Sequence, residues 1–400
     1  MRVLINGGGV AGLTLAFWLR RHGIEPVVVE RAAHGRLGGY GIDFFGTGYD
    51  VAARMGIVDR LAPHRLPVDS VDFVDAAGRP GARLTAPLLD KVIQGPHLAL
   101  MHTTLEGALL DAVEGDVEIR FGETVTAVRD TGSAVEAEFA GGTTERFDLL
   151  VGADGIHSRT RELAFGPEPE FARYLGCRLA CFPVADRYDW GRARVHYTEP
   201  GRQVVVYPTG RTGELIALFL FRSSHTGNVP RAERPGLLRS TFGGMGWLTP
   251  SLLAEAPADE PIFMDTMTQI VMPAWHRGRV ALVGDACGCM TMVSAQGVSM
   301  AMAGAYVLAE ELARHGDHVG AFTRYQERVR AEVAHRQRNA QMFIRTLVPG
   351  TRPGLVAQSL IQRLIMREAF APLLRRQFGA SSFLPPQNPE PRQGVIHGDR

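Results

Sequence analysis

Three glycines and one acid near the start of the chain form a pattern that can bind a dinucleotide. Gly7, Gly9 and Gly12 fit the spacing G-x-G-x-x-G between a strand-like run and a helical pattern. The first glycine permits a tight turn, the second lets a pyrophosphate approach the backbone, and the third lets helix and strand pack closely. Glu30 follows the next strand-like run, where a carboxylate can accept hydrogen bonds from a ribose. Because Glu30 would repel a ribose phosphate, the site favours FAD or NAD over NADP.

Two later segments place an acid next to a glycine at the end of an apolar run. These segments are Asp154-Gly155 and Gly284-Asp285. An acid at the carboxyl end of a buried strand in an α/β sheet lies where ligands bind. Gln296-Gly297 then precedes a helical pattern, whose N-terminal N–H groups could face an anionic or electron-rich ligand.

The elements that must hold these residues alternate in type. Residues 2–6 and 27–29 are apolar runs typical of buried strands, and residues 10–21 between them have an approximate helical pattern. Together they predict a βαβ opening. Residues 68–84 and 192–221 contain strand–turn–strand patterns with Gly and Pro in the turns. We therefore predict an α/β protein that combines a Rossmann-like domain with a mostly antiparallel sheet.

Composition excludes several classes of protein. The chain has 400 residues, more than one core usually organises, so two interlocked domains are expected. Its hydrophobic fraction of 45% and charged fraction of 21% exclude a wholly disordered or fibrous chain. The formal net charge of +1 predicts no nucleic-acid partner and no membrane partner for the chain as a whole, while a local charged patch stays open.

Targeting and metal-binding patterns are also lacking. Residues 286–309 carry no charge, but their three glycines and four polar side chains favour an internal loop and a buried helix over a membrane span. The first residues lack the pattern of a signal peptide, so a cytoplasmic location is expected. The four cysteines have neither the spacing of a zinc site nor that of a disulfide framework, so no metal is expected.

The three motifs, in this order and at these separations, resemble those of the class A flavoprotein monooxygenases of the para-hydroxybenzoate hydroxylase type. The resemblance spans about residues 1–345. It implies bound FAD, with NADPH or NADH as a transient reductant, and a Rossmann-like FAD-binding domain interleaved with a mostly antiparallel substrate domain over the flavin. The implied FAD-binding domain comprises residues 1–66, 98–166 and 275–345, the substrate-binding domain comprises residues 67–97 and 167–274, and residues 346–400 form a C-terminal helix and an extended tail.

The resemblance also implies which residues bind the cofactor. The glycine turn and the acid after it hold the ADP half, and Gly284-Asp285 binds the ribityl chain. The Asp-Gly motif, with Arg161, serves both the fold and the approach of reduced nicotinamide. Asp43 lies in a stretch that passes the isoalloxazine ring. The implied cofactor-binding residues are Gly7, Gly9, Val10, Ala11, Gly12, Glu30, Arg31, Asp43, His102, Asp154, Gly284, Asp285, Gln296 and Gly297.

The sequence departs from the family pattern at three points. Cys287, Gly288 and Met292 stand where the family usually has alanine, histidine and a proline. Because that proline borders the site of oxygen addition, its replacement leaves a non-oxidative role open. Ala295 replaces a glycine in the loop that approaches the flavin, which tightens that loop. His102 replaces the arginine of an Arg-x-x-Leu motif and is a weaker, pH-dependent phosphate partner.

The substrate pocket is expected to be apolar with few polar groups. Tyr207 and Phe219 lie in the apolar runs of the substrate domain and are candidates for its lining. Met290 and Met292 lie near the flavin loop, where flexible thioethers would suit a large irregular substrate. Plain core filling explains each methionine equally well.

These residues predict an FAD-dependent oxidoreductase. The first interpretation is an NAD(P)H-driven monooxygenase of a hydrophobic polycyclic or polyketide-like small molecule in secondary metabolism, such as antibiotic biosynthesis. The flavin carries the chemistry, so no catalytic protein residue is singled out, and the chain has no G-x-S-x-G motif. Two alternatives stay open. One is a flavoprotein that holds FAD structurally while its pocket catalyses a non-redox cyclisation, and the other is a non-catalytic small-molecule binding protein.

Overall fold

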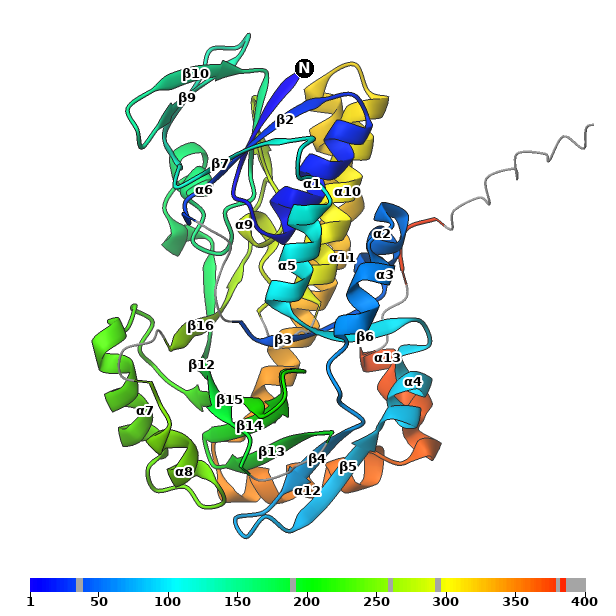
Figure 1. Ribbon diagram of the computed structural model, residues 1–400, viewed down its shortest axis with the longest axis vertical. Helices are drawn as coiled ribbons and strands as arrows, with labels where there is room; N and C mark the ends of the chain where they lie inside the picture. The colour runs from blue at the N-terminus through cyan, green and yellow to red at the C-terminus, as the bar shows by residue number, and fades with distance from the viewer. Residues whose placement is uncertain (34–38, 188–191, 258–261, 292–295, 379–381, 386–400) are drawn as a thin grey trace, which may run out of the picture.

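The computed structural model describes residues 1–33, 39–187, 192–257, 262–291, 296–378 and 382–385. A mostly parallel sheet lies toward one end of the long axis, and a larger, mostly antiparallel sheet lies toward the other (Figure 1). The N-terminus is at the end with the parallel sheet (Figure 1). The mixed α/β architecture confirms the predicted fold class.

The first sheet has six strands in the order β17-β18-β11-β1-β2-β7. From β18 to β7 each neighbouring pair is parallel, whereas β17 is antiparallel to β18. The apolar runs of the central strands are buried, as is typical of a parallel sheet that is covered on both faces. The strands are β1 (Arg2–Asn6), β2 (Glu25–Glu30), β7 (Glu118–Phe121), β11 (Leu149–Gly152), β17 (His276–Arg277) and β18 (Val280–Leu282).

Helices cover one face of this sheet and a small sheet covers the other. Val3 and Ile5 pack into one core with the helices α1 (Val10–Arg21) and α10 (Gly297–Arg314), which contact each other. Leu4, one position out of phase, faces the opposite core. That core is closed by the three-stranded antiparallel sheet of β8 (Val125–Asp130), β9 (Val135–Phe139) and β10 (Thr144–Phe147).

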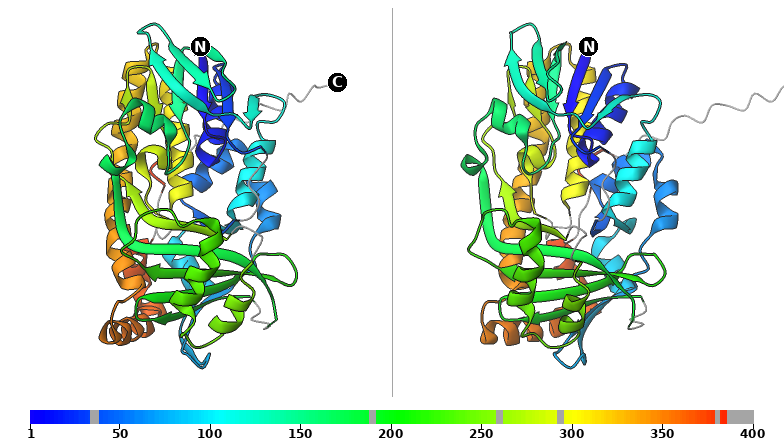
Figure 2. Two further views of the ribbon diagram at one scale, coloured as in Figure 1. Left: turned by 90° about the vertical axis from the view of Figure 1, so that its left-hand side faces the viewer. Right: turned by 60° about the vertical axis from the view of Figure 1, so that its left-hand side comes forward.

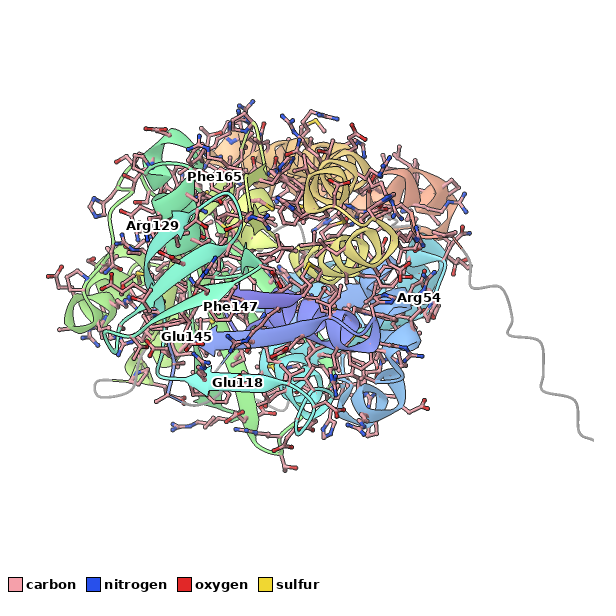
Figure 3. All side chains as sticks on the ribbon, turned by 90° about the horizontal axis from the view of Figure 1, so that it is seen from above. Arg54, Glu118, Arg129, Glu145, Phe147 and Phe165 are labelled. Carbon is pink, nitrogen blue, oxygen red and sulfur yellow. The ribbon has the colours of Figure 1, made fainter. Side chains whose placement is uncertain are left out.

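A cluster of charges fastens the small sheet to the parallel sheet. Glu145 of β10 accepts hydrogen bonds from Arg2 of β1 at 3.2 Å and from Arg120 of β7 at 2.5 Å. Beneath it, Phe147 meets Phe139 edge to face, with ring centroids 6.4 Å apart. Figure 3 shows Glu145 and Phe147 on the strands that lie across this end of the molecule. The two sheets at this end therefore form one tightly connected unit.

The second large sheet has seven strands in the order β16-β12-β15-β14-β13-β4-β5. All neighbouring pairs are antiparallel except β13 and β4. One face is covered by the helices α7 (Arg234–Phe242) and α8 (Thr249–Ala254) over a core of aromatic and branched side chains. The strands are β4 (Ser70–Val74), β5 (Pro80–Thr85), β12 (Ala172–Ala185), β13 (Ala193–Glu199), β14 (Arg202–Pro208), β15 (Glu214–Arg222) and β16 (Phe263–Ile270).

Shorter elements complete the fold, and some of them lie between the parallel sheet and the seven-stranded sheet. The strands β3 and β6 pair antiparallel between them, and their loops lead into helices on both sides (Figure 1). These elements are β3 (Gly41–Phe45), β6 (His97–Met101), α2 (Thr47–Met55), α3 (Val58–Leu61), α4 (Ala86–Ile93), α5 (His102–Asp111), α6 (Arg159–Ala164) and α9 (Asp285–Gly288), with short 3-10 turns at Ala62–His64, Glu168–Glu170, Arg231–Glu233 and Glu368–Phe370.

The helix α11 (His318–Leu347) ties these two sheets together. It packs against α10 near its start, and Ile344 near its end lies in a core with Leu179 of β12 and Leu220 of β15. Two helices follow, α12 (Arg352–Ile365) and α13 (Ala371–Phe378). They lie within residues 346–400, for which a single helix and an extended tail are predicted, and residues 386–400 lie outside the described residues.

Candidate active site

The glycine turn between β1 and α1 leaves no room for side chains at Gly7 and Gly12. Gly7 has a φ of 118°, and a β-carbon there would lie 2.4 Å from the carbonyl oxygen of Ala153. A β-carbon at Gly12 would lie 1.9 Å from the carbonyl oxygen of Gly7. Gly9 precedes α1, so the first N–H groups of the helix, including those of Val10 and Ala11, have no acceptor within the helix. This turn therefore offers the N–H cradle that a pyrophosphate needs.

Glu30 ends β2 with its carboxylate fixed beside the glycine turn. One oxygen accepts a hydrogen bond from the N–H of Gly8 at 2.8 Å, and the other accepts one from the N–H of Ala32 at 2.9 Å. The carboxylate lines a cavity of about 240 Å³ together with Gly8, Gly9 and Thr103. Arg31 is exposed beside it. The position and the fixed orientation of Glu30 suit an acceptor for ribose hydroxyls.

A second carboxylate, which belongs to none of the three motifs, lines the same cavity. Glu106 of α5 places an oxygen 3.6 Å from the β-carbon position of Gly9, and its other oxygen lies 3.4 Å from Nδ1 of His102. His102 begins α5, and its ring is 5.3 Å from that of Tyr40. The spacing of four residues between His102 and Glu106 on one helix is the signal for this pair. Glu106 thus brings negative charge to the place where a pyrophosphate would pass.

The His102–Glu106 pair makes a prediction about FAD affinity. His102→Arg is expected to tighten FAD binding about tenfold, because a guanidinium is permanently charged and can bind a phosphate through two donors. Titration of the flavin-free protein with FAD, followed by flavin fluorescence, measures the Kd. Glu106→Gln serves as the companion variant and should also tighten binding, since it removes the opposing charge. Equal affinities for the wild type and His102→Arg would contradict the assignment of His102 to the phosphate.

Asp154 acts as an anchor within the protein. One carboxylate oxygen accepts hydrogen bonds from Asn6 Nδ2 at 3.0 Å and from the N–H and hydroxyl of Thr160 at 2.8 and 3.0 Å, and the other accepts one from the hydroxyl of Ser158. These contacts join the end of β1 to the start of α6. Asp154 therefore holds the end of β1, which leads into the glycine turn, and this contact is a structural role.

Arg161 links the Asp-Gly motif to the Gly-Asp motif. Its side chain is fully buried and donates to the carbonyl oxygen of Ala286 at 3.0 Å and to that of Ile156 at 2.7 Å. It also pairs with Glu168 at 2.8 Å. A permanently charged, branched donor is well suited to bind three acceptors at once.

His157 connects the Asp-Gly motif to the seven-stranded sheet beside Arg161. Its Nδ1 lies 3.0 Å from Glu168, and its Nε2 lies 3.9 Å from Asp265 of β16. The nearby carboxylates of Asp265 and Glu168, the second of which is hydrogen-bonded to the ring, raise the pKa of His157 from 6.5 to about 10. The charged histidine therefore holds a strand of the large sheet against the Asp-Gly motif.

This bridge predicts a pH-dependent stability. Since the folded pKa is raised, the bridge contributes fully below pH 6.5, and its contribution is lost as the pH rises toward 10. The side chain is 64% exposed, so solvent screening limits the contribution to about 1 kcal/mol. Urea unfolding of the wild type and of His157→Gln should differ by that amount at pH 6, and the difference should disappear as the pH rises through 10. A difference that is the same at both pH values would show that the histidine charge does not contribute.

Gly284 and Asp285 lie against the glycine turn. Gly284 has a φ of 66°, and a β-carbon there would lie 2.9 Å from the β-carbon of Ala11. Asp285 begins α9, and burial raises the pKa of its carboxyl group. Gln296 and Gly297 form the start of α10. The structure thus brings the first and third motifs together, as the resemblance implies.

The two cysteines next to Asp285 are buried free thiols. Burial raises the pKa of Cys287 to about 12 and that of Cys289 well above its usual value. Cys287 lies 3.8 Å from the hydroxyl of Tyr325. Because the thiolate is the reactive form, neither residue is set up as a nucleophile. Met290 is buried with Trp275 and Met300 around a small internal space, and Met292 lies outside the described residues.

A polar group joins β3 to the large sheet. Arg194 of β13 binds Asp43 through two hydrogen bonds of 2.9 and 3.3 Å, and its guanidinium lies 5.4 Å from the centre of the Tyr207 ring. The Tyr207 hydroxyl accepts a hydrogen bond from the N–H of Gly41 at 2.9 Å. Burial alone would raise the pKa of Asp43, but the charge and hydrogen bonds of Arg194 outweigh it and hold the pKa below its usual value. Asp43 therefore stays ionised and paired.

The face of the large sheet that carries Tyr207 is largely apolar. Tyr207 shares a small core with Cys181, Val205 and Ile216, and Tyr40 packs against it from the cofactor-binding side. His196 of β13 lies on the same face, and both of its ring nitrogens are buried. Burial lowers the pKa of His196 to about 3, so this histidine is neutral.

Phe219 does not join this group. Its side chain is fully buried on the opposite face of the sheet, stacked on Phe182 at 5.4 Å and edge-on to Phe242 of α7 at 5.1 Å. The expectation that Phe219 lines the substrate pocket is therefore corrected. Arg194 belongs to none of the motifs, yet it lies on the face that carries Tyr207.

Comparison with known proteins assigns the family. The model of the family described as FAD binding domain matches residues 1–175 and 255–345. The chain belongs to that family. It is 32% identical over 347 residues to a flavin-dependent monooxygenase of an unknown prokaryotic organism, a match that covers 84% of this chain and 87% of the relative. A flavin-dependent monooxygenase of Legionella longbeachae is 31% identical over 348 residues, with the same coverage.

Solved structures have the same architecture. The tetracycline destructase Tet(55) is 29% identical to this chain, with a TM-score of 0.79. The match covers 92% of this chain and 96% of that protein. Klebsiella pneumoniae HpxO complexed with FAD and uric acid shares the fold, with a TM-score of 0.78 and 23% identity. That match covers 94% of this chain and 96% of the HpxO chain. The protein is thus an FAD-dependent monooxygenase of class A. This assignment favours oxidation over the cyclase and the non-catalytic binding role.

The described residues fit FAD. The N–H groups at the start of α1 and the turn without side chains suit the pyrophosphate, and the 240 Å³ cavity beside Glu30 suits the adenosine. Asp285 is buried close to the same turn, where it can meet the ribityl chain. The carboxylate of Glu106, by contrast, opposes a bound phosphate.

Proposed function

We propose that the protein uses NADPH or NADH and dioxygen to oxidise a hydrophobic polycyclic or polyketide-like small molecule of secondary metabolism. The observation that carries this proposal is the apolar sheet face around Tyr207 with a fixed cation, Arg194. An apolar lining with few polar groups is typical of a pocket for such ligands. Support also comes from the similarity to a tetracycline destructase and to an FAD-dependent monooxygenase of Sarocladium schorii, 28% identical over 331 residues.

The chain's own residues divide the work between cofactor and substrate. Bound FAD supplies the redox chemistry, which carries electrons from the reduced nicotinamide to dioxygen. The N–H groups of Val10 and Ala11 hold the pyrophosphate, Glu30 holds the ribose and Asp285 holds the ribityl hydroxyls. His102, at the start of α5, takes the place of an arginine as the partner of the phosphates.

On the substrate side, Arg194 is the orienting group. Its pairing with Asp43 fixes the guanidinium, so that its remaining donors can bind an oxygen atom of the substrate. Tyr207 and the apolar side chains next to it exclude water from the reacting part of the substrate. No side chain of the protein needs to act as a nucleophile, since oxygen transfer is flavin-centred.

Oxygen uptake tests this proposal. The purified protein is mixed with NADPH or NADH in an oxygen electrode, with a tetracycline or another fused-ring phenol as the hydrophobic compound and uric acid as the small polar comparison. The fused-ring compounds are expected to stimulate uptake about tenfold and to yield a product that contains one added oxygen atom. Stimulation by uric acid alone would contradict the proposed substrate class while leaving the monooxygenase assignment intact.

A further inference from the structure

The outward face of α12 is apolar along its length. Val356, Leu360, Ile361 and Leu364 are 60%, 62%, 54% and 49% exposed. Their spacing of three to four residues places them on one side of the helix. Among all residues of α12, none is buried. A continuous apolar stripe on the surface marks an interaction site rather than a solvated helix.

The side of α12 that faces the protein is mixed. Gln358 donates hydrogen bonds to the carbonyl oxygens of Thr346 and Leu347 at 2.7 and 3.2 Å, and Ile365 packs against a small core that includes Leu88 of α4. A surface helix of a globular protein normally buries its most apolar side, whereas four large apolar side chains of α12 lie on the outside. The packing of α12 thus leaves its apolar side available to a partner.

Arginines surround this apolar stripe. Residues 337–385 contain seven arginines, no lysine and a single acid, Glu368, which pairs with Lys91 at 2.5 Å. The formal charge of the whole chain is only +1, so this excess is local and averages out over the full sequence. The exposed arginines near the stripe are Arg352, Arg363, Arg367 and Arg375.

We infer that α12 docks in the plane of an anionic lipid bilayer, with its apolar face at the acyl boundary and its arginines at the headgroups. Such a combination of apolar stripe and basic rim is what in-plane membrane helices use. The helix has 14 residues, too few to span a bilayer. Within the described part of the chain, no helix is long and apolar enough to cross a membrane. The expectation of no membrane partner rested on the whole-chain charge, which does not describe this region.

The position of α12 suits this partner. The helix lies at the end of the molecule formed by the seven-stranded sheet, away from the N-terminus (Figures 1 and 2). A second copy of the chain fits less well, because a two-fold contact would bring the same arginines of both copies together. The inference is independent of the proposed substrate.

Vesicle flotation of the full-length, FAD-loaded protein tests the inference. Vesicles of phosphatidylcholine with phosphatidylglycerol are compared with vesicles of phosphatidylcholine alone, at low and high salt. The wild type is expected to float with the anionic vesicles at low salt. Leu360→Asp should reduce the bound fraction about tenfold, and the double variant Arg352→Gln/Arg363→Gln should remove the preference for anionic vesicles. The matched control is Val319→Asp in α11, a valine that is 53% exposed outside the stripe, which should bind like the wild type.

Three outcomes would overturn the inference. The first is a wild type that does not float with anionic vesicles, and the second is a Leu360→Asp variant that floats as well as the wild type. The third is light scattering that shows a dimer of the wild type and a monomer of Leu360→Asp, which would assign the face to a second copy. Flavin content and melting temperature verify that each variant is folded. If Leu360→Asp does not fold, the double variant Arg352→Gln/Arg363→Gln still tests the inference.

Discussion

Gly12→Ala is expected to yield a protein that retains no flavin. The added β-carbon would lie 1.9 Å from the carbonyl oxygen of Gly7, and the backbone fixes both positions, so neither atom can rotate away. The start of α1 must then move off β1, which disperses the N–H groups that hold the pyrophosphate. Overpacking of this kind costs about 3 kcal/mol of unfolding free energy. The ratio of flavin to protein absorbance after gel filtration measures the effect, and urea unfolding measures the stability.

The matched control is Gly236→Ala. Gly236 lies in α7, where a β-carbon would meet no atom within 4 Å, and the change should leave both flavin content and stability at or above the wild-type values. A Gly12→Ala variant with full flavin content would show that the turn is not a cofactor site.

Asp43→Ala is expected to have the second-largest effect, a loss of about 2 kcal/mol of unfolding free energy together with most of the activity. The change leaves the guanidinium of Arg194 largely buried without its carboxylate, which is costly because the charge has lost its partner. The side chain of Asp43 is 34% exposed, so water moderates the loss. Urea unfolding and steady-state kinetics measure the two effects.

A second pair on a neighbouring loop provides the control. Arg192 binds Asp69 at 2.6 Å, but both side chains are well exposed, so Asp69→Ala should cost no more than about 0.5 kcal/mol and leave activity unchanged. The double variant Asp43→Asn/Arg194→Gln should recover stability but not activity, since it removes the unpaired charge and also the orienting cation. Recovery of both would mean that the pair serves only the fold.

The cofactor-binding end could be predicted from the sequence because its signals are local. The glycine spacing, the short apolar runs and Glu30 lie within one βαβ unit. In the structure the glycines lie between β1 and α1, and Glu30 lies at the end of β2. The Asp-Gly and Gly-Asp motifs follow strands of the same parallel sheet. A parallel sheet gathers the carboxyl ends of its strands at one edge, so order along the chain is enough to predict their neighbourhood.

The substrate side could not be predicted in the same way. Residues 215–221 of β15 form an unbroken apolar run, and such a run gives no alternation from which to assign faces. The prediction for Phe219 is wrong for this reason. Arg194 pairs with Asp43 across 151 positions of sequence, and that contact depends on how β3 meets the large sheet. Only the folded arrangement shows that this arginine is held beside the apolar face around Tyr207.

The most direct test of the central claim is the absorbance spectrum of the purified protein, followed without oxygen while NADPH is added. An FAD-dependent monooxygenase is predicted to show a flavin band that bleaches with NADPH and returns when air is admitted, with one oxygen atom in the product for each NADPH consumed in the presence of a suitable substrate. A flavin that stays oxidised while substrate is converted would contradict the redox role. A protein that binds no flavin at all would contradict the assignment of the glycine turn, Glu30 and Asp285 to the cofactor.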